Sequence, residues 1–224
     1  MSLIPEYLSE YIDEIQPYCG GKLGELQQQA YEEGLPIIHN DVARLLAVLL
    51  EMTKPKYILE IGMAVGFSAS FMCGYLQEGG HLTTIDRYPI MIEAAKENFK
   101  RMGVEDKVTM KIGHAEEVLA EMDGTFDFIF MDAAKGKYIE FLPHCLRMLR
   151  PGGIIVADDV LQDGRVAQKY EEIPRRQRTI HKRMNEFLET ISNSPELTSS
   201  ILTIGDGVAI IRKKEVMDKE DTNE

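Results

Sequence analysis

Three aspartates and one lysine lie just beyond apolar runs of this sequence, where buried strands are expected to end. Asp132 follows the apolar run 126–131, and Lys135 comes three residues later. Asp158 and Asp159 follow a second apolar run. Around Asp132 alone, the pattern is equally typical of a helix N-cap followed by a surface lysine.

The three aspartates together predict a metal site. If their strands are adjacent, the carboxylates of Asp132, Asp158 and Asp159 meet in one pocket, where they repel one another and shift each other's pKa values. A hard divalent cation removes this conflict, because Mg²⁺ takes oxygen ligands. The alternative is three independent helix caps or loop acids.

A glycine-containing turn and a further aspartate indicate a nucleoside site. Gly62 and Gly66 follow the first expected strand, and Asp86 ends the second. A carboxylate there suits a ribose diol, because it accepts hydrogen bonds from both hydroxyls. The turn is not GxGxxG, and no Walker lysine follows, which excludes a P-loop. Taken singly, Asp86 equally fits an N-cap for the helix after Pro89.

Strands alternating with helices must position these residues, and this alternation predicts a mainly parallel α/β sheet with helices on both faces. We expect an N-terminal helical part over 1–54, a core over 55–213 in one domain of residues 1–213, and a polar tail over 214–224. The Asp-Gly turn at 206–207 predicts a hairpin, so that the last strand runs antiparallel. Pro143 is expected to kink its helix. The strands are expected at 57–62, 81–86, 107–113, 126–132, 152–159, 197–205 and 207–214, and the longest C-terminal helix at 175–192.

Composition narrows the class of protein. The 224 residues are 44% hydrophobic and contain no apolar run long enough to cross a membrane. The acidic start is unlike a signal peptide, and three widely spaced cysteines favour a reducing cytoplasm. The net charge of −12 argues against nonspecific nucleic-acid binding. Residues 165–183 are nevertheless strongly basic; the alternative interpretation is the solvated face of a helix.

Four segments carry a family resemblance: LEIGMAVGFSA, FDFIFMDAAKGKY, LRPGGIIVADDVL and GDGVAI. They resemble the cation-dependent class I O-methyltransferases, which include catechol and caffeoyl-CoA O-methyltransferases. The similarity runs from about residue 35 to residue 213. It implies a Rossmann-like fold of seven strands, S-adenosylmethionine as methyl donor, Mg²⁺ or Mn²⁺ bound at the acceptor, and a homodimer.

The resemblance also implies roles for single residues. Lys135 is the catalytic residue, reaching the acceptor hydroxyl that the metal polarises. The metal ligands are Asp132, Asp158 and Asp159, although many relatives have Asn at the third position. The implied cofactor-binding residues are Glu60, Gly62 and Ser68 on the methionine side, Asp86 at the ribose, Ala115 at the adenine, Ile38 in a covering segment, and Asp132.

Within the family, the sequence is most similar to bacterial tRNA 5-hydroxyuridine methyltransferases, which make 5-methoxyuridine at the wobble position. LPII, DDVLQDGRVA and the basic IPRRQRTIHKR support this similarity. The tRNA anticodon loop would then be the partner, held by residues 165–183. Two alternatives remain open: O-methylation of a small catechol-like or phenylpropanoid-like compound, and a nucleotide-binding α/β protein without catalysis.

Overall fold

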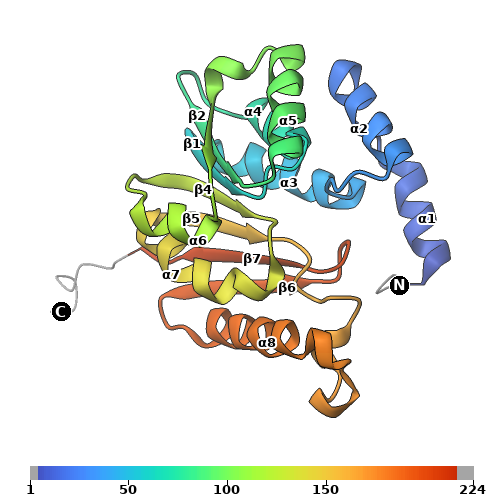
Figure 1. Cartoon of the computed structure of the whole chain (residues 1–224), viewed down its shortest axis with the longest axis vertical. Helices are drawn as coiled ribbons and strands as arrows, with labels where there is room; N and C mark the ends of the chain where they lie inside the picture. The colour runs from blue at the N-terminus through green and yellow to red at the C-terminus, as the bar shows by residue number, and fades with distance from the viewer. Residues whose placement is uncertain (1–4, 216–224) are drawn as a thin grey trace, which may run out of the picture.

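The computed structural model describes residues 5–215 and contains one sheet of seven strands in the order β3-β2-β1-β4-β5-β7-β6 (Figure 1). The strands β1 to β5 are parallel, and β7 pairs antiparallel with both β5 and β6. The predicted mostly parallel, Rossmann-like sheet with an antiparallel last strand is therefore confirmed. The strands are β1 (Tyr57–Ile61), β2 (His81–Asp86), β3 (Val108–Ile112), β4 (Phe126–Met131), β5 (Leu149–Ala157), β6 (Leu197–Leu202) and β7 (Val208–Lys213).

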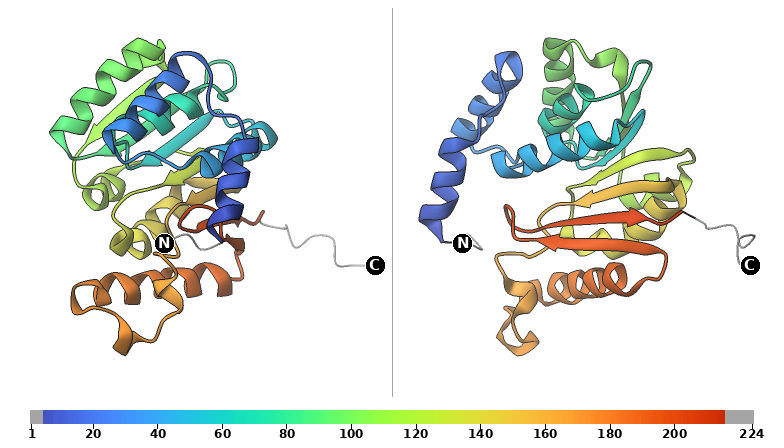
Figure 2. Two further views of the ribbon diagram at one scale, coloured as in Figure 1. Left: turned by 90° about the vertical axis from the view of Figure 1, so that its right-hand side faces the viewer. Right: turned by 180° about the vertical axis from the view of Figure 1, so that it is seen from behind.

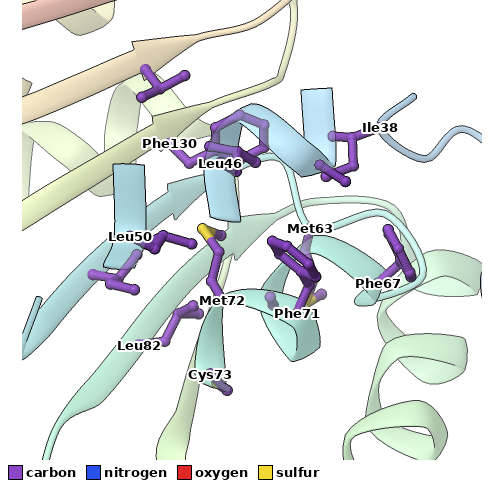
Figure 3. Packing of buried hydrophobic residues seen from close by; sticks show 14 of the residues in the cluster. Ile38, Leu46, Leu50, Met63, Phe67, Phe71, Met72, Cys73, Leu82 and Phe130 are labelled. Carbon is purple, nitrogen blue, oxygen red and sulfur yellow. The ribbon is translucent and has the colours of Figure 1, made fainter. Parts of the chain in front are cut away.

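Helices cover both faces of the sheet because alternate residues of each strand point to opposite sides. One face packs against α3, α4 and α5, and the other against α6, α7 and α8. Figure 3 shows the first cluster, in which Leu46 and Leu50 of α3 lie with Phe71 of α4 and Phe130 of β4. The helices are α1 (Glu6–Ile15), α2 (Gly21–Glu33), α3 (Asn40–Thr53), α4 (Phe67–Cys73), α5 (Pro89–Met102), α6 (Ala115–Glu121), α7 (Tyr138–Met148) and α8 (Arg178–Asn193).

The N-terminal part is helical, as expected. The helix α2 packs on α4 and α5, whereas α1 extends away from the sheet (Figure 2). The rest of the expected polar tail, residues 216–224, lies outside the described residues. No helix within residues 5–215 is long and apolar enough to cross a membrane.

Two local expectations differ from the structure, at β5 and α8, while the kink at Pro143 stays a prediction. The strand β5 begins at Leu149, earlier than expected, because Leu149 pairs with Phe126 before the register shifts. The helix α7 continues through Pro143. The helix α8 begins only at Arg178, because residues 161–177 form the short 3-10 turns η3 (Arg165–Ala167), η4 (Tyr170–Glu172) and η5 (Arg175–Gln177).

Candidate active site

The parallel strands bring their carboxyl ends to one edge of the sheet, and a cavity of about 570 Å³ lies there. Its walls contain six of the predicted cofactor-binding residues: Ile38, Gly62, Ser68, Asp86, Ala115 and Asp132. Gly62 has φ +102°, and a Cβ at this position would lie 1.9 Å from the carbonyl oxygen of Asp132. Only glycine therefore allows β1 and β4 to end so close together.

Asp86 organises the turns around this cavity. Its Oδ2 accepts hydrogen bonds from the backbone N–H groups of Met63 (3.1 Å) and Ala64 (3.0 Å). Its Oδ1 accepts from those of Arg87 (2.6 Å) and Tyr88 (3.0 Å). The carboxylate thus ties the turn after β1 to the turn after β2. A ribose diol bound here would share an acceptor that already serves four donors.

Glu60 lies behind the cavity wall and does not line it. The side chain is fully buried, and its two oxygens accept hydrogen bonds from Ser68 Oγ (2.6 Å) and Thr84 Oγ1 (2.5 Å). Burial raises the pKa of Glu60 to about 7, against the opposing effect of the two hydroxyl donors. Of the three residues expected on the methionine side, Gly62 and Ser68 reach the cavity.

Ile38 and Ala115 lie in the wall at element boundaries. Ile38 belongs to the connection between α2 and α3, where the hydroxyl of Tyr31 donates to its carbonyl oxygen at 3.2 Å. Ala115 is the first residue of α6. Each connection therefore carries its residue to the same edge of the sheet.

At the ends of β4 and β5, Lys135 lies between two carboxylates. Its Nζ is 3.7 Å from Asp132 Oδ1 and forms a closer ion pair with Asp159 Oδ2. Burial lowers the pKa of Lys135, but the charges of Asp132 and Asp159 outweigh this and raise it above its usual value. The side chain is therefore held as an ammonium ion.

The carboxyl groups respond to the same crowding. Burial, together with the charge of Asp159, raises the pKa of Asp132, while Lys135 opposes this shift. Burial and the charges of Asp132 and Asp159 raise the pKa of Asp158 well above its usual value. Asp158 Oδ1 accepts a hydrogen bond from the Asp159 backbone N–H at 2.8 Å. Three carboxyl groups therefore crowd around one ammonium group, and the raised pKa values of Asp132 and Asp158 express the cost of charging them together.

These carboxyl groups suit Mg²⁺ or Mn²⁺ in chemical kind, because they are hard oxygen donors. Within residues 5–215, however, no three His, Cys, Asp or Glu side chains are arranged to hold a metal ion. Asp159 instead turns toward Lys135. The donor set fits the ion, and binding would require Asp159 to exchange the ammonium group for the metal.

A second cavity, of about 480 Å³, meets the first at Ala134 and Lys135, which line both. The turn after β4, the segment after β5, the start of α8 and the turn between β6 and β7 form its walls. Three of its cations are paired with acids, Arg165 with Asp163, Arg183 with Glu140, and Lys137 with Glu140 and Glu116. Among the described residues, Gln177 Oε1 and His181 Nδ1 in these walls have no hydrogen-bond partner.

The sequence did not indicate this second cavity. Its walls come from segments that are far apart in the chain, and His181 reads as an ordinary position of the helix expected at 175–192. The only signal was the long interval between β5 and α8, which carries few strong helix or strand patterns.

The seven cations of the basic segment 165–183 divide into three groups, the first being Arg165 and Arg183 with their ion pairs described above. Arg178 holds the segment together, because Nε donates to the carbonyl of Ile173 at 3.0 Å and its guanidinium lies 5.0 Å from the centre of the Tyr170 ring. Four other cations are exposed, and no ion pair is found for them within residues 5–215: Lys169, Arg175, Arg176 and Lys182.

Comparison with known proteins gives one family. The family model described as O-methyltransferase matches residues 14–214. A catechol O-methyltransferase of Niastella koreensis is 32% identical over 75% of this chain and 79% of its own length. A caffeoyl-CoA O-methyltransferase of Populus kitakamiensis is 31% identical over 93% of this chain and 94% of its own length.

Solved structures agree with this family. A Staphylococcus aureus structure, provisionally described as a caffeoyl-CoA O-methyltransferase, is 29% identical, with a TM-score of 0.84 over 93% of this chain and all of its own. The SAH-bound methyltransferase PaMTH1 of Podospora anserina is 26% identical, with a TM-score of 0.82 over 96% of this chain and all of its own.

Proposed function

This chain belongs to the O-methyltransferase family, and from that premise we propose that it methylates 5-hydroxyuridine at the wobble position of tRNA to 5-methoxyuridine. The enzyme is an S-adenosylmethionine-dependent O-methyltransferase of the catechol and caffeoyl-CoA type. One observation supports the methyl transfer itself: two cavities meet at Ala134 and Lys135. A donor in the first and an acceptor in the second would face each other across Lys135.

The donor belongs in the cavity lined by Gly62 and Asp86. The similar PaMTH1 structure contains SAH, the demethylated form of this donor. The walls contain both apolar residues, such as Ile38 and Phe67, and polar ones, such as Ser68 and Asp86, which suits a molecule with an aromatic ring and a ribose. Holding donor and acceptor in line contributes roughly 7–11 kcal/mol to lowering the barrier.

Lys135 acts on the acceptor oxygen. A protonated lysine stabilises the negative charge that develops on this oxygen as the methyl group is transferred. The raised pKa of Lys135, which results from Asp132 and Asp159 outweighing the effect of burial, supports this role over that of a general base. Bound Mg²⁺ or Mn²⁺, held by Asp132, Asp158 and Asp159, would lower the pKa of the acceptor hydroxyl.

The distribution of charge around the acceptor cavity supports a nucleotide within an RNA chain. The cations of the cavity wall are paired with acids, which suits a neutral ring. The four exposed cations for which residues 5–215 show no ion pair lie outside the cavity wall, on 169–182, where phosphates flanking an extruded base would pass. Anticodon-loop bases are already partly unstacked, so that presenting one costs less than flipping it from a duplex.

A small catechol-like or phenylpropanoid-like acceptor is the second candidate. The names of the relatives from Niastella koreensis and Populus kitakamiensis favour it. A catechol and a 5-hydroxyuracil both place a hydroxyl beside a second oxygen, so that the same lysine and metal would serve either. We also propose that the enzyme acts as a homodimer in the cytoplasm.

The test compares the two acceptors in a pair of charge-reversal variants. Arg175→Glu/Arg176→Glu should reduce methylation of hydroxyuridine-containing tRNA at least tenfold, with a much smaller effect on a catechol. Arg178 is excluded, because it holds the segment together. Lys100→Glu/Lys111→Glu, which changes the net charge equally at exposed sites on α5 and β3, is the control. If wild-type enzyme never methylates the tRNA, or both acceptors respond alike, the small-molecule function replaces the RNA function.

The metal is tested separately. Activity should disappear in EDTA and return with Mg²⁺ or Mn²⁺. Asp159→Asn should retain most activity, since an amide oxygen also coordinates these ions. Full activity in excess chelator would exclude the metal.

A further inference from the structure

The hydroxyl of Tyr138 lies where β4 and β5 end. It is 3.1 Å from the carbonyl oxygen of Met131 and 3.0 Å from that of Asp158. The backbone N–H of Ala133 donates to it at 3.3 Å. One buried oxygen therefore joins the backbone on both sides of Asp132 to the backbone of Asp158.

The hydroxyl, and not the ring, is the unusual part of this side chain. Tyr138 is fully buried, and its ring packs against Phe141 and Phe187 with centroid distances of 6.4 and 5.6 Å. A phenylalanine would fill nearly the same volume in this apolar cluster. Burying a hydroxyl costs free energy unless the hydroxyl is hydrogen-bonded. The role of the Tyr138 hydroxyl therefore lies in the polar groups that it contacts.

Two backbone groups depend on the Tyr138 hydroxyl for a hydrogen bond. A phenol has one proton to donate. The carbonyl of Met131 already accepts from the backbone N–H of Asp158 at 2.9 Å, which leaves the carbonyl of Asp158 as the group that needs the proton. The Ala133 N–H in turn needs the phenol oxygen as acceptor. Without the hydroxyl, both backbone groups would be buried without this partner.

These contacts lie at the junction of the two cavities. Ala133 is adjacent to Asp132 and two residues from Lys135, and Asp158 is the first carboxylate after β5. We propose that Tyr138 is a positioning residue, whose hydroxyl fixes the separation of the β4 and β5 ends and thereby the placement of Lys135 against the carboxylates. This inference rests on the proposed function, since Lys135 is taken as the group that acts on the acceptor.

The test is Tyr138→Phe, assayed with whichever acceptor the wild type methylates. We expect kcat to fall at least tenfold, because displacement of a reacting group by about 1 Å costs up to a hundredfold in rate. The dissociation constant for S-adenosylmethionine, measured by calorimetry, should change little. Hydrogen exchange of the Ala133 amide should accelerate at least tenfold. This last measurement needs no acceptor, so that it remains informative if the proposed function fails.

A matched control separates positioning from general destabilisation. Ile191→Ala removes buried volume in α8 within the same apolar cluster and should lower the Tm while largely preserving kcat below the transition. Incorporation of 4-aminophenylalanine at position 138, which restores a donor, should recover much of the rate, and it replaces Tyr138→Phe as the test if that variant does not fold. Wild-type kcat in Tyr138→Phe, unchanged exchange of Ala133, or an equal loss of kcat in Ile191→Ala would overturn the proposal.

Discussion

Lys135 links the two cavities, and its ammonium group lies between Asp132 and Asp159. We predict that Lys135→Ala lowers kcat about a hundredfold or more, the usual loss when a group that stabilises a developing oxyanion is removed. The calorimetric affinity for S-adenosylmethionine should stay near that of the wild type, because the wall around Gly62 and Asp86 is retained. Turnover close to the wild-type rate in a folded Lys135→Ala protein would exclude Lys135 from the mechanism.

Glu60 carries a buried carboxyl group, and burial raises its pKa from 4.5 to about 7. Between these two values the folded protein binds a proton that the unfolded chain has released, so that stability falls as the pH rises through this window. The stabilisation is complete below pH 4.5 and lost above about pH 7, and it amounts to about 3 kcal/mol, at 1.36 kcal/mol per pKa unit.

Glu60→Gln should remove this dependence. Urea unfolding at several pH values is expected to show the stability of the variant rising relative to that of the wild type from pH 4.5 to pH 7. Glu97→Gln, at an exposed position on α5, should leave the pH profile unchanged. Parallel profiles for wild type and Glu60→Gln would mean that Glu60 remains ionised throughout.

At the scale of elements, the turn after β1 depends on one glycine. A Cβ at Gly62 would meet backbone atoms of Asp132 at 1.9 and 2.7 Å, and these atoms belong to the adjacent strand end. Gly62→Ala should therefore push β1 and β4 apart and lower the free energy of unfolding by roughly 3 kcal/mol or more. Urea unfolding measures this loss, and the affinity for S-adenosylmethionine should fall with it.

Gly79 provides the matched substitution. It also has positive φ, +67°, but a Cβ there has nothing within 4 Å. Gly79→Ala should cost only the backbone strain, about 1 kcal/mol. If the two alanine variants lose equal stability, steric contact between the strand ends is not what requires Gly62.

The whole molecule combines a net charge of −12 with a local group of four exposed cations on 169–182. An RNA acceptor should therefore bind through these cations alone, while the rest of the surface repels it. The plot of log K against log salt concentration should have a slope no steeper than about −3, from four phosphate contacts at about 0.7 each on a single strand. Methylation kinetics measured from about 50 to about 200 mM salt, a range that includes the physiological value, give this slope. A catechol acceptor should show almost none, and a flat plot for tRNA would contradict the phosphate contacts.

The sequence by itself determined the architecture and the edge of the sheet at which chemistry occurs. Apolar runs separated by helical patterns require parallel strands, and parallel strands place their carboxyl ends together. For this reason Asp86, Asp132 and Asp158 were predicted at one edge, where the structure has them. The Asp-Gly hairpin determined the direction of the last strand in the same local way.

Tertiary structure decided which of these side chains face a cavity and which face the core. Glu60 pairs in register with Thr84 across β1 and β2, and this register, which no local pattern encodes, turns its carboxyl group toward Thr84 and Ser68. Arg178 reads as one of many basic residues, yet the fold of 165–177 makes it a structural contact. The acceptor cavity and the Tyr138 hydrogen bonds likewise join residues distant in sequence. Such contacts arise only when the packed elements bring distant backbone and side-chain groups together.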